Sequence, residues 1–233
     1  MPRSRTADIR VFSTNAMRAV LPGLAAAFER SSGHAVAIDW STTVQTLERI
    51  RRGETADVVI ATAAGLDELT RQGRIVAASR AQLASTLVGI GVRAGTAKPD
   101  IGSVEAFARA LLKAKSIAYT TLGQSGVHFE QVIDRLGIAT QLKSKFKVIP
   151  GGLVGEIVVR GEAEIGVQMM SEILAVEGFE LVGPFPPGLQ QVNTFAAAVL
   201  DGSRQAEAAR EFVRFLTAPA AMRMMRAHGF ESA

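Results

Sequence analysis

Hydroxyl and amide side chains stand at three places where a predicted β-strand passes into a predicted helix. Ser13, Thr14 and Asn15 follow the first apolar run, and Thr42 with Thr43 follows the second. These side chains donate hydrogen bonds, and a helix start adds unpaired backbone N–H groups and a partial positive charge. Together such groups can hold an anion without any formal positive charge.

The third and richest of these turns is YTTLGQSGV at residues 119–127, which is followed by no charged residue before Glu130. It offers Thr121, Ser125 and Gly126, and a glycine allows a ligand to approach the backbone closely. Ser and Thr at helix starts also act as ordinary N-caps, worth about 1 kcal/mol each, and a cap needs one hydroxyl. For any one turn we expect capping, whereas three turns at one edge of the sheets favour an anion site.

Two further polar residues are candidates for ligand contacts. His128, on the first turn of the helix after this loop, could donate to an anion or titrate with it if it faces the ligand. Gln168 lies in a strand that is apolar on both sides, and a buried amide needs hydrogen-bond partners. A bound ligand is one candidate partner for that amide.

The sequence lacks the motifs of nucleotide-binding, metal-binding and hydrolytic sites. The chain has no phosphate-binding loop with a catalytic lysine, no dinucleotide-binding glycine motif and no Cys. His34, His128 and His228 are far apart and lack the spacing of a zinc site. Ser125 and His128 would lie side by side on one helical turn, but no third residue is evident to orient a nucleophile–base pair. We therefore predict no metal, no cofactor and no hydrolytic catalysis.

Charge and hydropathy narrow the class of partner. The 26 Lys and Arg against 22 Asp and Glu give a net charge of +4, with the basic residues scattered rather than interleaved with aromatics. Nucleic acid is therefore not expected as a partner. No stretch reaches the roughly 18 apolar residues that a membrane span needs, so no direct membrane insertion is expected. The N-terminal run MPRSRTADIRVF lacks the apolar middle of a signal peptide, which leaves a cytoplasmic location open.

Strand-like runs alternate with helical periodicity, which predicts an α/β fold with a largely parallel sheet. The segments RRGETADVVIAT and VRGEAEIGVQMM repeat one pattern, as two lobes of like construction would. Pro22 is expected to kink or restart the first helix. We expect strands at 9–14, 34–42, 56–62, 85–95 and 116–121 and helices at 15–33, 44–53, 103–114 and 153–161.

Three motifs, in this order, resemble the type II periplasmic solute-binding proteins, most closely the molybdate-binding-like branch of ABC transporter substrate-binding proteins. They are VFSTNAMRAVLPGLAAAFERSSG, STTVQTLERIRRGETADVVIA and RGEAEIGVQMMSEI. The resemblance implies two α/β lobes with mixed, mostly parallel sheets: residues 1–84 with 196–233, and residues 85–195. Two extended hinge crossings, near 85–92 and 192–200, would join the lobes, and a ligand cleft would lie between them.

The resemblance also implies a function. The family's members are periplasmic receptors that bind a small anion, an oxyanion or organic carboxylate, and pass it to an ABC-type membrane permease. Hydroxyls and backbone N–H groups hold the anion in that family, and Ser13 with Thr42 or Thr43 matches the hydroxyl positions of the first lobe. We expect such a receptor to be a monomer.

Two departures from the molybdate binders point to another anion, such as a small organic carboxylate. Met169 stands where those proteins commonly have Tyr, and the turn after AYTT is longer. Aconitate isomerase resembles these binders and works without cofactors, so a cofactor-independent isomerase of a small unsaturated acid is the alternative. Moving an allylic proton needs a base, for which His128 is the first candidate and Glu156 the second. A cytoplasmic ligand-sensing module is a third hypothesis.

Overall fold

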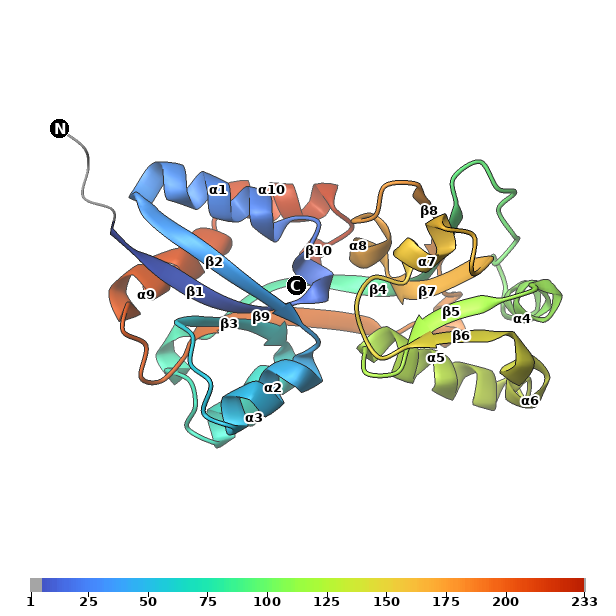
Figure 1. Ribbon diagram of the computed structural model, residues 1–233, viewed down its shortest axis with the longest axis horizontal. Coiled ribbons are helices and arrows are strands. Elements are labelled where there is room, and N and C mark those ends of the chain that lie inside the picture. The colour runs from blue at the N-terminus through green and yellow to red at the C-terminus, as the bar shows by residue number, and fades with distance from the viewer. Residues whose placement is uncertain (1–5, 233) are drawn as a thin grey trace. The chain divides into compact units, whose positions relative to one another are not determined.

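The computed structural model describes residues 6–232, and these form two compact units (Figure 1). Unit 1 comprises residues 6–85 and 194–232, and unit 2 comprises residues 86–193. The chain passes from one unit to the other inside two strands, β4 (Ala81–Arg93) and β9 (Val192–Val199). Residues 1–5, part of the segment assessed above for a signal peptide, and residue 233 lie outside the described range.

Unit 1 is an α/β sheet whose first three strands are parallel. In β1 and β2, Thr14 pairs with Ser41, and in β1 and β3, Ser13 pairs with Ile60. β9 is antiparallel to β3, and β10 is antiparallel to β4. The strands of this unit, besides β4 and β9, are β1 (Thr6–Thr14), β2 (His34–Ser41), β3 (Val58–Thr62) and β10 (Glu231–Ser232). Its helices are α1 (Leu21–Ser32), α2 (Thr43–Arg51), α3 (Ala63–Arg71), α9 (Ala206–Leu216) and α10 (Pro219–Ala227), with 3-10 turns η1 (Asn15–Met17) and η2 (Ala77–Ser79).

Helices cover both faces of this sheet because successive strand residues point to opposite sides. Val11 and Val58 pack in a core with Phe28 of α1 and other residues of α9 and α10. Phe12 and Val59, one residue further along, pack on the other face in a core that includes side chains of α2 and α3. Figure 1 shows α1 and α10 on one side of the strands and α2 and α3 on the other. Because β1, β2 and β3 are parallel, their carboxyl ends lie at one edge of the sheet, which the helices on its two faces leave uncovered.

Unit 2 repeats this plan with a mixed sheet. β5 is parallel to both β6 and β7, whereas β7 and β8 run antiparallel to β4. Its further strands are β5 (Ile117–Thr120), β6 (Phe146–Ile149), β7 (Ile165–Met169) and β8 (Phe179–Pro184). Its helices are α4 (Val104–Lys113), α5 (Gln124–Arg135), α6 (Ala139–Leu142), α7 (Gly155–Val159) and α8 (Met170–Ile173), with 3-10 turns η3 (Lys143–Lys145) and η4 (Pro187–Leu189).

The two faces of the second sheet also carry separate cores. One core joins strand residues such as Ile90 and Val167 to Phe107 of α4 and Phe129 of α5. The other surrounds Phe179 and includes side chains of α7 and α8. Helices on both faces again leave the strand ends as the places where polar side chains of the sheet can meet a ligand.

The predicted fold class is confirmed, and two helix starts differ from expectation by more than two residues. The helix expected over 15–33 begins at Leu21, after the 3-10 turn η1, because Pro22 lacks a backbone N–H and is tolerated in a first helical turn. The helix expected after the turn at 119–127 begins within it, at Gln124. None of the helices within residues 6–232 is long and apolar enough to cross a membrane.

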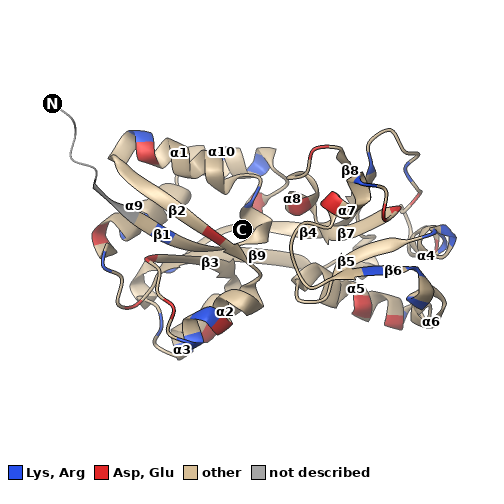
Figure 2. Ribbon diagram, in the orientation of Figure 1, with Lys and Arg blue, Asp and Glu red and all other residues tan. Residues whose placement is uncertain are grey.

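Charged residues lie mostly on the helices and loops. Figure 2 shows blue and red positions side by side on α2 and α3. Exposed ion pairs are formed in this region, such as Arg52 with Glu48 at 2.9 Å. Such exposed pairs contribute little to stability, at most about 1 kcal/mol each. The strand ends are instead dominated by neutral hydroxyls.

Candidate functional site

The strand ends of unit 1 bring a group of buried hydroxyls together. Thr14 and Ser41 are paired in the register of β1 and β2, and Thr62 ends β3 beside them. Ser13 is fully buried, and its Oγ donates only a long bond of 3.3 Å to the Thr14 carbonyl. Thr62 was missed in the sequence, although it stands between an apolar strand and a helix as the predicted residues do. The whole polar group is made up of the amide residue Asn15 and the hydroxyl residues Ser13, Thr14, Ser41, Thr42, Thr43 and Thr62, all of them buried.

Three of these hydroxyls accept a hydrogen bond from the backbone. Thr42 caps α2, where Gln45 N–H donates to Thr42 Oγ1 at 3.2 Å and the Gln45 side chain accepts from Thr42 N–H. Thr62 N–H donates to Thr43 Oγ1, and Gly65 N–H donates to Thr62 Oγ1, each at 3.2 Å. Capping was the ordinary explanation offered for Thr42, and it is confirmed. A hydroxyl that accepts in this way keeps its own O–H to donate, so capping and anion binding are compatible.

A cation lies at the same edge. Arg18 Nε donates to Asn15 Oδ1 at 3.1 Å, and the guanidinium lies over the Trp40 ring with its carbon 5.3 Å from the ring centre. Within residues 6–232, Arg18 forms no ion pair with a carboxylate. The structure holds Arg18 half-buried at the strand ends, without a carboxylate partner in the described range.

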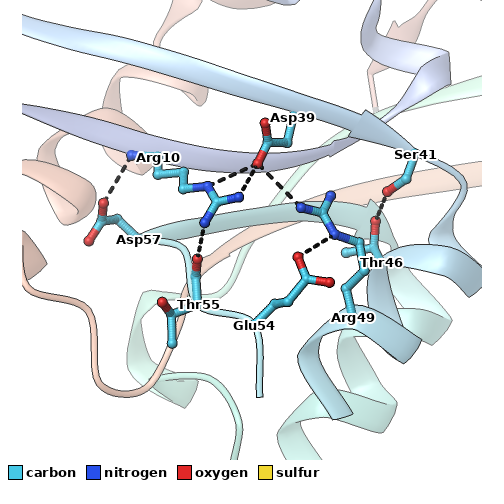
Figure 3. Close-up of polar contacts among 8 residues, drawn as sticks. All are labelled: Arg10, Asp39, Ser41, Thr46, Arg49, Glu54, Thr55 and Asp57. Atoms are coloured by element: carbon cyan, nitrogen blue, oxygen red, sulfur yellow. Dashed lines mark hydrogen bonds and ion pairs between the residues drawn. The ribbon is translucent and has the colours of Figure 1, made fainter. Parts of the chain in front are cut away.

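The other arginines near β1 and β2 are neutralised by carboxylates. Asp39 Oδ2 accepts from Arg10 at 2.7 Å and from Arg49 at 3.3 Å, and Arg49 also pairs with Glu54 at 2.9 Å (Figure 3). Burial raises the pKa of the Asp39 carboxyl, but the hydrogen bonds and charges of Arg10 and then Arg49 outweigh burial and hold the pKa below its ordinary value. This network therefore ties β1, β2 and α2 together and leaves little free charge.

In unit 2 the turn after β5 leads directly into α5. Gly123 is the N-cap residue and provides no side-chain cap, while Thr121 is exposed and its N–H donates to the Ile149 carbonyl at 3.1 Å. Ser125 is buried in the first turn, and among the described residues its hydroxyl makes no hydrogen bond. The hydroxyls of this turn are thus not engaged in capping.

The packing of α5 against β5 requires a glycine at position 126. A Cβ atom at Gly126 would lie 1.6 Å from the Thr120 carbonyl oxygen, a distance at which the atoms overlap. The glycine lets the first turn of α5 pack against the end of β5. Its predicted contact with a ligand stays a prediction, but the need for glycine here is explained by the helix.

His128 and Gln168 both have protein partners. His128 Nε2 lies 2.7 Å from the Leu189 carbonyl oxygen, which can only accept, so Nε2 carries a proton and a neutral ring has its lone pair on Nδ1. Gln168 Oε1 accepts from Val154 N–H at 2.7 Å, and its Nε2 donates to the Gly152 carbonyl at 2.9 Å. The buried amide is therefore satisfied by the loop before α7, and no ligand is needed to explain it.

Two other residues complete the polar strand end of this unit. Ser171, which follows β7 in the first turn of α8, is fully buried, and its hydroxyl has no hydrogen-bond partner within the described part of the chain. It was missed, although its place just after an apolar strand matches the other hydroxyls. Glu156, the second candidate base, is exposed in the first turn of α7. Within residues 6–232 no group of three or more His, Asp or Glu side chains could hold a metal ion.

Comparison with known proteins identifies relatives that align with nearly the whole chain. The profile of the family described as bacterial extracellular solute-binding protein matches residues 9–231. An aconitate isomerase of Pseudomonas sp. is 32% identical over 229 residues, which cover 96% of this chain and 87% of that protein. The molybdate-binding protein ModA of Azotobacter vinelandii is 25% identical over 241 residues, covering 97% and 91% of the two chains.

The fold is shared with a solved structure as well. The periplasmic molybdate-binding protein of Azotobacter vinelandii superposes with a TM-score of 0.82 at 20% identity, covering 97% of this chain and 99% of that one. At that level of identity the likeness speaks for the fold alone. It agrees with the two α/β units and the type II periplasmic binding architecture.

Proposed function

The chain belongs to the family of bacterial extracellular solute-binding proteins, and we propose that it binds a small anion through the polar strand ends of its units. We further propose that the protein delivers this anion to an ABC-type membrane permease, that it is located in the periplasm, and that it is a monomer. The permease and the periplasmic location are supported by the family membership and by the ModA relative, whereas the monomeric state is a proposal of its own.

The observation that carries this proposal is the way the hydroxyls of unit 1 are bonded. Thr42, Thr43 and Thr62 each accept from a backbone N–H, so each has its proton left to donate. An anion accepts such protons, whereas a cation would not be bound by them. The donors are held rigidly by the helix starts, so little conformational entropy is lost when they bind.

Arg18 favours a carboxylate as the anionic group. A guanidinium presents paired donors that match the two oxygens of a carboxylate, and its hydrogen bonds to ionised groups are the strong ones. Its Nε is engaged by Asn15, so the Nη groups are the donors that a ligand would meet. We therefore propose a small organic acid in preference to a simple metal oxyanion.

An isomerase is the second candidate, favoured by the 32% identical aconitate isomerase that aligns with nearly the whole chain. Moving a double bond in an unsaturated acid requires a base that removes one allylic proton and returns a proton at the other end of the allyl system. His128 Nδ1 would be that base, since Nε2 is held by the Leu189 carbonyl and fixes the ring. Glu156 is the second candidate because its carboxylate is exposed.

The deciding experiment is a thermal-shift screen of the protein against oxyanions and small di- and tricarboxylates, with proton NMR of every hit. A ligand at 100 times its dissociation constant should add about 2.7 kcal/mol of stability, which a melting curve resolves. Stabilisation with an unchanged ligand spectrum supports a receptor. Slow conversion of the ligand, lost in His128→Gln, supports the isomerase. A screen without any anion that stabilises the protein would refute both.

A further inference from the structure

A cavity of about 230 Å³ lies in unit 1, between the start of β4 and one face of α9. Its wall combines side chains that are more than a hundred residues apart in the sequence. Ala78 and Ala81 also contribute, so apolar atoms lie beside the polar groups. The residues that matter here are Ser79, Arg80, Arg210, Val213, Arg214 and Thr217.

This cavity is separate from the strand-end hydroxyls. Ser79 Oγ accepts from Val199 N–H at 2.8 Å, and Val199 pairs with Val58 at the beginning of β3. Thr62, at the polar end of the same strand, is four residues further on, about 13 Å at 3.3 Å per residue. The cavity is therefore at the opposite end of the sheet from the proposed ligand site.

Positive charge at this cavity is poorly compensated. Arg80 Nη2 pairs with Asp67 Oδ1 at 2.8 Å, but Arg80 Nε is buried and has no hydrogen-bond partner in the described range. Arg210 and Arg214 lie one helical turn apart on α9, and neither forms an ion pair within residues 6–232. Like charges at this spacing repel each other.

The hydroxyls of the cavity do not offset that charge. Ser79 Oγ donates to the Val76 carbonyl at 2.6 Å, and Thr217 Oγ1 donates to the Arg214 carbonyl at 2.8 Å. Both protons are used within the protein, so guanidinium groups are the donors left for a ligand. Three such groups around one cavity, with a single carboxylate partner, favour an anion with more than one charge and several oxygen atoms.

We propose that this cavity is a second anion site, specific for a phosphate group and distinct from the strand-end site. Arg80 Nε and the guanidinium groups of Arg210 and Arg214 would donate to the phosphate oxygens. The group could be free inorganic phosphate or the phosphoryl group of a small phosphomonoester, since both present the same oxygens. The proposal is independent of the function proposed above, because no residue is shared between the two sites.

The test is a titration of the ¹⁵N-labelled protein with inorganic phosphate, in a buffer without other oxyanions and at constant ionic strength. We expect saturable shifts of the backbone amides of residues 78–81 and 210–217. Arg210→Gln and Arg214→Gln should each weaken phosphate binding at these amides at least about fivefold, because each removes a charged donor. Arg223→Gln is the matched control, since it removes an exposed arginine of α10 in the same unit and should leave the affinity unchanged.

A parallel titration with glycerol phosphate identifies the source of the group. If glycerol phosphate binds more tightly than inorganic phosphate, the natural ligand is a phosphomonoester. If it binds more weakly, the natural ligand is the free phosphate ion. The proposal is overturned if these amides do not shift saturably, or if all three glutamine variants bind phosphate alike. Shifts confined to the amides near Thr14 and Thr62 would also overturn it, and would leave the strand-end proposal standing.

Discussion

The Arg18 guanidinium donates to Asn15 Oδ1 at 3.1 Å. This hydrogen bond joins the two side chains just after β1, beside the buried hydroxyls. The same guanidinium covers Trp40, the single tryptophan of the chain. Arg10 and Arg49 are neutralised by Asp39, whereas Arg18 has no carboxylate partner within residues 6–232. This contrast makes Arg18 the cation from which ligand selectivity is expected.

Arg18→Gln is expected to weaken binding of a carboxylate ligand by roughly tenfold to a hundredfold, since a hydrogen bond to a charged group contributes about 1.5–3 kcal/mol. The free energy of unfolding should fall by only about 1 kcal/mol, the value of the lost contacts with Asn15 and Trp40. Quenching or enhancement of Trp40 fluorescence provides the titration signal. Arg30→Gln, an exposed change on α1, is the control, and equal affinities in the two variants would rule out Arg18 as a ligand contact.

Ser125→Ala and Thr121→Ala are expected to weaken ligand binding, by about 1 kcal/mol each, with little loss of fold stability. The Ser125 hydroxyl makes no hydrogen bond among the described residues, so its removal leaves no orphaned partner. Calorimetric titration with the anion found in the screen measures the effect. Unchanged affinity in both variants would reduce the turn at 119–127 to a helix start without a role in binding.

Gly126→Ala should lower the free energy of unfolding by more than about 2 kcal/mol, because its Cβ would overlap the Thr120 carbonyl oxygen at 1.6 Å. Helix α5 must then move away from β5, so ligand binding should fall as well. Gly188→Ala is the matched control, since a Cβ there meets a Val104 methyl group at an ordinary 3.8 Å. Chemical denaturation compares the two, and equal stability would show that α5 adjusts at no cost.

The Asp39 carboxyl provides a test of pH dependence. Its pKa is lowered in the folded protein, so its pairing with Arg10 and Arg49 stabilises the fold above the unfolded pKa of about 3.9 and is lost as the pH falls through the lower folded value. Asp39→Asn should therefore cost at most about 1 kcal/mol near neutral pH, since the carboxylate is partly exposed. The difference from the parent protein should shrink as the pH falls below the unfolded pKa and vanish once the carboxyl is protonated in the folded protein as well. A difference that stays constant with pH would mean that the charge is not what stabilises this contact.

Much of the fold could be predicted from the sequence because it rests on local patterns. The alternation of apolar runs with helical periodicity indicated an α/β chain. The positions of Ser13 near the end of one strand, and of Thr42 and Ser125 after others, placed hydroxyls at strand ends. Parallel strands bring their carboxyl ends to one edge, so the clustering in unit 1 followed from the strand order. Helix starts were less predictable, because single residues such as Pro22 and Gly123 decide in which turn a helix begins.

Side-chain partners were decided by the tertiary structure alone. Gln168 is satisfied by the loop before α7, and Gly126 is required by the carbonyl of Thr120, neither of which a one-dimensional pattern indicates. Arg80 and Arg210 line one cavity although 130 positions separate them. The sequence by itself determined where strands, helices and polar turns occur, because these depend on neighbours along the chain. Which charges are paired, which donors are left free and which residues share a cavity depend on packing between distant segments, and only the folded chain decides that.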